Sequence, residues 1–175
     1  MRFRGRMTLI TLLFVASAGL SIGGANAQQP PTASANTPAP DYGLSLTNEQ
    51  AKAAAAAALA EAQKNNWRMA VSVVGPDGVP IYFEKMDGTQ NASAPLALAK
   101  ARTAALYRRT TKVFADQFAA GNTGFMSFPE EARPIASEGG MPILVNGKIA
   151  GAIGVSGGIG QQDTLAATAG ANALK

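Results

Sequence analysis

Stretches of small and apolar residues at helical spacing predict four helices along the chain. Residues 48–64 are rich in alanine, the best helix former, and Thr47 with Gln50 has the spacing of a capping box. A second helix is expected over residues 94–109, a shorter one over residues 112–119 and a last one over residues 163–174. Helices therefore separate the strand-forming segments of this chain.

The second expected helix carries both an apolar stripe and a cluster of cations. Ser93 precedes it as the expected N-cap, and Pro95 suits its first turn. The stripe expected to face the interior consists of Leu96, Ala99, Thr103 and Leu106. The cations expected to project away from this stripe are Lys100, Arg102, Arg108 and Arg109.

Segments rich in β-branched residues predict strands that are joined by tight turns. These segments are residues 69–74, 79–86, 133–136, 141–145 and 148–155. Pro76-Asp77-Gly78 suits the turn of the first hairpin, and Asn146-Gly147 is typical of a type I′ turn in the last one. Because hairpins connect the strands, we expect an α+β fold, an α-β-α sandwich with a mainly antiparallel sheet flanked by helices.

The glycine-rich segment 151–163 invites comparison with a phosphate-binding loop. Asp163 stands where the dinucleotide fingerprint needs its last glycine, and no Gly-Lys-Ser/Thr sequence of a P-loop is present. Gly151 and Gly154 inside a strand instead predict a close approach of another backbone. A bound anion at the following helix start is the less favoured alternative, because Asp163 already compensates the helix dipole.

The first 27 residues have the three regions of a secretory signal peptide. Three arginines form a basic region, residues 7–20 are apolar, and Ala25-Asn26-Ala27 matches the cleavage pattern. The apolar part is too short for a comfortable membrane span, so we expect cleavage after Ala27 and a periplasmic or secreted protein without stable membrane insertion. Cleavage leaves 12 basic and 11 acidic residues, and the formal charge falls from +4 to +1.

The remaining composition divides the mature chain and excludes several kinds of chemistry. Residues 28–45 are rich in proline and alanine and predict a flexible linker, followed by a single domain over residues 46–175. The chain has neither histidine nor cysteine, which excludes disulfides, thiol catalysis, Ser-His-Asp triads and histidine-ligated metals. The small net charge gives no reason to expect nucleic acid as a partner.

Three segments taken together resemble one known family. KARTA at residues 100–104, EGGMPI at 138–143 and GAIGVSGG at 151–158 occur in the order found in the GlcG/HbpS-like proteins. This family is related to the C-terminal domain of the PduO corrinoid adenosyltransferases. The resemblance implies a profilin-like sandwich that forms homo-oligomers, octamers in some members, and that binds haem in some members.

Haem iron bound by this chain would lack its usual histidine ligand, because the sequence has no histidine. Methionine, tyrosine or lysine can also ligate haem iron. The candidates are Met69, Met86, Met126, Met141, Tyr82 and Tyr107. Packing in the core or at an edge of the fold is the stronger expectation for each of them, methionine above all. No separate metal site is expected.

The candidate ligand-binding residues are Lys100, Arg102, Thr103, Glu138, Gly139, Gly140, Met141 and Ser156. Arg102 is suited to hold a carboxylate or propionate, and the alternative is an internal salt bridge to Glu138 or Asp163. Glu138 is the best candidate for moving a proton if its surroundings are dry. Ser156 is suited to donate to a ligand or to cap the turn.

Three functions remain open at this level. The first is an exported protein that binds or senses a small molecule such as haem, without catalysis, between the second helix and residues 138–141. The second is a small isomerase, tautomerase or hydrolase of an organic acid, in which Arg102 holds the carboxylate and Glu138 moves a proton. The third is an oligomeric adaptor, in which the apolar loop residues Phe125, Met126 and Phe128 form an interface rather than a ligand lid.

Overall fold

The computed structural model describes residues 38–174, so the predicted signal peptide and most of the predicted linker lie outside the described residues. The helices are α1 (Asn48–Lys64), α2 (Ser93–Tyr107), α3 (Lys112–Ala119) and α4 (Gly160–Asn172). The strands are β1 (Ala70–Val74), β2 (Pro80–Lys85), β3 (Gly140–Val145) and β4 (Lys148–Ser156). Two 3-10 turns, η1 (Gly124–Ser127) and η2 (Glu130–Ala132), follow α3.

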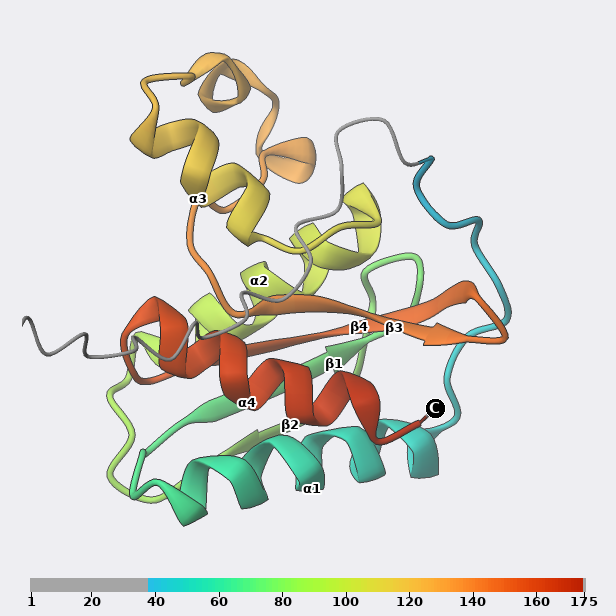
Figure 1. The fold of residues 1–175 in the computed structure, drawn as a ribbon, viewed down its shortest axis with the longest axis vertical. Coiled ribbons are helices and arrows are strands. Elements are labelled where there is room, and N and C mark those ends of the chain that lie inside the picture. Colours follow the sequence, from blue (N-terminus) through green and yellow to red (C-terminus); the bar gives the residue numbers. More distant parts are fainter. Residues whose placement is uncertain (1–37, 175) are drawn as a thin grey trace, which may run out of the picture. The chain divides into compact units, whose positions relative to one another are not determined.

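The four strands form one antiparallel sheet between two layers of helices (Figure 1). The strand order is β2-β1-β4-β3, so each hairpin places one strand at the centre and one at an edge. Helix α2 covers one face of the sheet, and α1 and α4 cover the other. The predicted α+β sandwich with an antiparallel sheet is confirmed.

The central strands β1 and β4 are buried on both faces because both helix layers pack on them. Val71 and Val73 point into the main core with the alanine faces of α1 and α4. Val74 and Ala152 point the other way, against the alanines of α2. Small helix residues let the helix axes approach the sheet closely, which is why a chain so rich in alanine forms a well-packed sandwich.

Two glycines, cross-strand partners in the sheet, allow α2 to lie directly on the strands. A Cβ on Gly154 would meet the backbone of Ala97 and Ala101, and one on Gly140 would meet the carbonyl of Lys100. A Cβ on Gly151 would likewise meet the carbonyl of Val74 in β1. The close approach predicted from the glycine-rich strand is therefore confirmed.

The local signals at the ends of several elements are also confirmed. The Thr47 hydroxyl accepts from the Gln50 amide at 3.2 Å, and the Gln50 side chain accepts from the Thr47 amide at 2.9 Å, as a capping box requires. Asn146 and Gly147 both have positive φ, at 52° and 74°, as a type I′ turn requires.

Helix α2 is rotated about its axis relative to the prediction. Its buried residues are Ser93, Ala97, Lys100, Ala101, Thr103, Ala104 and Ala105, whereas the expected stripe residue Leu106 is exposed. Alanine, and not leucine, faces the sheet because the glycine pair permits a very short distance there. Ser93 does not cap the helix: it lies inside the first turn, and its buried hydroxyl has no hydrogen-bond partner among residues 38–174.

Two other boundaries differ from the prediction. Residues 133–136 form no strand, because this segment runs along α2, where the Thr103 hydroxyl accepts from the amide of Ile135 at 3.0 Å. Helix α4 begins at Gly160, three residues before the expected start, and the Gln162 side chain accepts from the amide of Ile159.

No helix among residues 38–174 is long and apolar enough to cross a membrane.

The described part of the linker packs on the domain. The amide of Gly43 donates to Ile149, the amide of Ile149 donates to Asp41, and the Tyr42 hydroxyl donates to the carbonyl of Leu106 at 2.9 Å. The Arg108 guanidinium lies over the Tyr42 ring. The ordered domain therefore begins before Leu46, where the sequence analysis placed its start, because Tyr42 finds partners that lie far along the chain.

Candidate functional site

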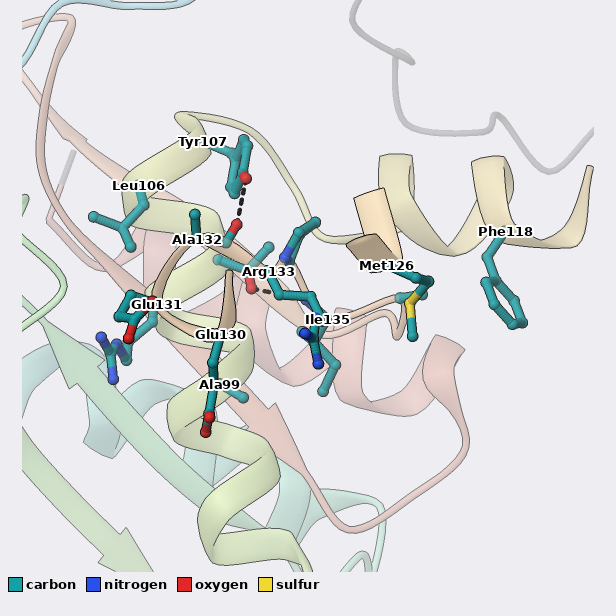
Figure 2. A pocket seen from close by; sticks show the side chains of 14 residues that line it. Ala99, Leu106, Tyr107, Phe118, Met126, Glu130, Glu131, Ala132, Arg133 and Ile135 are labelled. Atoms are coloured by element: carbon teal, nitrogen blue, oxygen red, sulfur yellow. Dashed lines mark hydrogen bonds between the residues drawn. The ribbon is translucent and has the colours of Figure 1, made fainter. Parts of the chain in front are cut away.

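An open cleft of about 530 Å³ lies on the side of α2 that faces away from the sheet (Figure 2). From α2 it is lined by Ala99, Arg102, Thr103, Leu106 and Tyr107. From the segment that follows it is lined by Phe118, Met126 and residues 130–136. Its volume falls in the range of small-molecule sites, and its walls are mostly apolar with a few charged groups.

Two hydrogen bonds from α2 hold the far wall of the cleft in place. The Tyr107 hydroxyl donates to the carbonyl of Ala132, and the Thr103 hydroxyl accepts from the amide of Ile135, as the dashed lines in Figure 2 show. These hydrogen bonds join two residues of α2, which lie about one turn apart, to the irregular segment 130–136. The cleft is therefore a built feature of the fold.

An aromatic cluster holds the segment that carries the rim of the cleft. The Phe114 ring packs edge-on against Tyr107, with ring centroids 4.9 Å apart, and against Phe125, with centroids 5.9 Å apart. Phe114 and Phe125 are buried, but Phe118 and Met126 at the cleft leave about half of their surface exposed, 48% and 47%. The cluster thus fixes the backbone of α3 and η1 while two apolar side chains stay available to a ligand.

The charged groups of the cleft differ in their availability. The Arg133 guanidinium donates from Nε and Nη2 to the carbonyl of Phe128, at 3.3 Å and 3.1 Å. Arg102 is exposed and makes neither a salt bridge nor a side-chain hydrogen bond within residues 38–174. Arg102 therefore has no internal salt bridge to Glu138 or Asp163, and its guanidinium can hold a carboxylate.

Lys100 was expected to project away from the interior, and the structure places it in the interior. Its Nζ lies 2.7 Å from Asp163 Oδ2 and donates to the carbonyl of Val155 at 3.1 Å. The two side chains are only 2% and 4% exposed. A buried ammonium needs such a partner, so Lys100 joins α2 to the end of β4 and the start of α4.

The second oxygen of Asp163 completes this buried cluster. Oδ1 accepts from the amide of Gly158 at 2.9 Å. Burial raises the pKa of the Asp163 carboxyl above its ordinary value, although the Lys100 ammonium and the Gly158 amide oppose the shift. Gly139 has φ +106°, and a Cβ there would lie 2.6 Å from that of Asp163 and 3.3 Å from Lys100 Nζ. The glycines around this pair thus make room for it.

The other predicted site residues lie outside the cleft. Glu138 Oε1 lies 3.6 Å from Lys112 Nζ, and its other oxygen accepts from the Thr164 hydroxyl at 3.4 Å. Gly140 donates its amide to the Thr111 hydroxyl, and Ser156 is buried. Met141 packs against the main core. Of the eight candidates, only Arg102 and Thr103 line the cleft, so Arg102 and Glu138 are not brought together there.

The cleft wall also contains residues that were not predicted as ligand-binding residues from the sequence. These are Ala99, Leu106 and Phe118, and, in the segment 130–136, Glu130, Glu131, Arg133 and Ile135 among others. The only sequence signal for this wall was an apolar loop, residues 124–128, followed directly by charged residues. No cluster of acidic side chains within residues 38–174 could hold a metal ion.

Comparison with known proteins places this fold and these motifs in one family. The family described as "Haem degrading protein HbpS-like" matches residues 46–172. The chain belongs to the HbpS-like family. Among curated relatives, protein GlcG of Escherichia coli K12 is 40% identical over 111 residues, which cover 63% of this chain and 81% of GlcG.

Two solved structures of similar proteins share the fold. A double mutant of Streptomyces reticuli HbpS has a TM-score of 0.68 and 29% identity, covering 84% of this chain and 99% of HbpS. The complex of PduOC with haem has a TM-score of 0.69 and 25% identity, covering 75% of this chain and 96% of PduOC. The predicted resemblance to the GlcG/HbpS-like family is therefore confirmed.

Proposed function

We propose that this HbpS-like protein binds haem, or a closely similar flat molecule with carboxylate arms, in the cleft on α2. One observation carries the proposal: the cleft combines apolar walls with an exposed guanidinium, Arg102, that has no partner within residues 38–174. The solved complex of the similar PduOC with haem supports the choice of ligand.

The residues of the cleft fit the two chemical parts of haem. Leu106, Phe118 and Ile135 offer apolar surface to a porphyrin ring. Arg102 offers a planar pair of donors to a propionate. Glu130 and Glu131 balance the two arginines of the cleft, so the attraction for the ligand is local to Arg102 and does not come from the net charge of the site.

We propose a binding or sensing role for the loaded protein and not catalysis. When bound, haem would supply an iron centre whose oxidation state or availability can be sensed. The protein's own residues bind and orient the ring: Thr103 and Tyr107 hold the wall, and Arg102 fixes a carboxylate arm.

Titration of the purified protein with haemin tests this function. The wild type should show a saturable shift of the Soret band at micromolar haemin. Arg102→Gln should weaken binding about tenfold, because a charge-assisted hydrogen bond is lost. Lys52→Gln on α1 changes the charge equally, lies outside the cleft, and should bind like the wild type. Absence of saturable binding by the wild type would overturn the proposal.

We also propose that the protein is exported and assembles into a homo-oligomer. The signal-peptide pattern of residues 1–27 supports export to the periplasm or the medium. Exposed apolar side chains outside the cleft, such as Phe83, Phe128 and Leu165, support self-association. Native mass spectrometry of the protein purified from its host reports the number of subunits, and a monomer at all concentrations would contradict the assembly.

A further inference from the structure

We infer that the thioether of Met126 is the ligand that this chain offers to haem iron in place of histidine. The inference rests on the proposed function and names one atom, Met126 Sδ, in the same cleft. Two observations carry it. The Met126 side chain is exposed at the cleft, and the other methionine and tyrosine candidates either lie elsewhere or already make structural contacts. Methionine is an established axial ligand of haem iron in other proteins.

The other candidate methionines and Tyr82 do not line the cleft. Met69 is fully buried, Met86 Sδ accepts from the amide of Met69 at 3.4 Å, and Met141 packs against the main core. The Tyr82 hydroxyl donates to Glu84 at 2.8 Å, and this bond raises the pKa of the phenol. None of the lysines within residues 38–174 lines the cleft. Of the six methionine and tyrosine candidates, Met126 and Tyr107 therefore line the cleft.

Tyr107 is held in a structural role. Its hydroxyl donates to the carbonyl of Ala132, and its ring packs edge-on against Phe114. Ligation of iron by this oxygen would remove the hydrogen bond that holds the wall of the cleft and would require the phenol to lose its proton. The structure therefore favours the thioether over the phenolate.

Met126 combines a fixed backbone with a free side chain. Its amide donates to the carbonyl of Thr123 at 2.9 Å, and the neighbouring Ser127 hydroxyl donates to Gly124 at 2.8 Å, which holds the 3-10 turn η1. The adjacent Phe125 is buried in the aromatic cluster. The Met126 side chain is 47% exposed at the cleft, and its flexible thioether can adjust to the iron of a bound ring.

Parallel titrations with haemin and with metal-free protoporphyrin test the inference. The proteins are the wild type, Met126→Leu, which keeps the apolar volume, and Tyr107→Phe, which keeps the ring. Met126→Leu should bind protoporphyrin like the wild type, but should bind haemin about tenfold or more weakly, because only haemin loses a ligand. It should also lose the long-wavelength absorption typical of ferric haem with a thioether ligand. Tyr107→Phe loses the hydrogen bond to Ala132, so it should weaken the binding of both porphyrins alike, but should keep this absorption when saturated with haemin.

The outcomes separate this inference from the proposed function. If Met126→Leu leaves the haemin spectrum and affinity unchanged, or if Tyr107→Phe saturated with haemin is the variant that lacks the iron-dependent spectrum, Met126 is not the ligand although haem still binds. If the wild type binds neither porphyrin, the proposed function fails and the inference fails with it. Circular dichroism of each variant verifies that it is folded.

Discussion

At the scale of single residues, the pairing of Lys100 with Asp163 decides how α2 is oriented. The ammonium and the carboxylate lie 2.7 Å apart and are almost fully buried, and they connect positions 63 residues apart in the chain. A local pattern assigns a lysine to the solvent because it cannot show a partner so distant. The predicted orientation of α2 was therefore wrong, although the predicted helix was right.

Removing one partner of this pair should destabilise the protein strongly. Asp163→Asn leaves the Lys100 ammonium buried without a counter-charge, and we expect a loss of about 3–5 kcal/mol in the free energy of unfolding. Asp116→Asn is the control: its ion pair with Lys112 is equally short, at 2.6 Å, but exposed, and should contribute less than about 1 kcal/mol. Urea unfolding monitored by circular dichroism measures both.

The double variant Lys100→Met with Asp163→Asn should be more stable than the sum of the two single losses implies. The reason is that no uncompensated charge stays buried once both partners are neutral. Losses that add to within about 0.5 kcal/mol would show that the two residues act independently, contrary to the geometry.

At the scale of elements, the sequence predicted the helices and hairpins well and the cleft poorly. The alanine run of α1, its capping box and the Asn146-Gly147 turn are local signals, and the structure follows them. The wall formed by residues 130–136 has no such periodicity. Hydrogen bonds with Thr103 and Tyr107 determine its path, and such tertiary contacts leave no local pattern.

The close packing of α2 on the sheet predicts the effect of adding a single methyl group. Gly154→Ala places a Cβ against the backbone of Ala97 and Ala101, which cannot move aside like a flexible side chain. We expect a loss of about 1–3 kcal/mol in the free energy of unfolding. Gly124→Ala, at a position with open space around the glycine, should change it by less than about 1 kcal/mol. Equal stability of the two variants would contradict the packing described for α2.

At the scale of the whole molecule, the sandwich carries the α2 cleft on the outer side of one helix layer. The family motifs KARTA, EGGMPI and GAIGVSGG serve mainly the packing beneath that layer, through Lys100, Gly140 and Gly154. Arg102 is the motif residue that reaches the solvent side, with a charge that has no partner in the described part of the chain. Most motif residues therefore stabilise the fold, while the segment after α3 supplies many of the residues that line the cleft.

The signal-peptide pattern makes a prediction about the mature chain. Expression of the full chain in an export-competent bacterium should give a protein whose mass corresponds to residues 28–175, because the pattern directs cleavage after Ala27. Substitution of Ala25 and Ala27 by larger residues should block this cleavage. A protein of full-length mass in the cytoplasm would contradict export.

Hydrogen exchange measured by mass spectrometry tests the central claim, that the cleft on α2 is the ligand site, most directly. Protoporphyrin in saturating amount should slow amide exchange in peptides that cover residues 121–136, which include the cleft residues Met126 and 130–136. Peptides that cover α1, on the opposite face of the sheet, should be unchanged. Slowed exchange confined to α1 or α4, with residues 121–136 unaffected, would contradict the account.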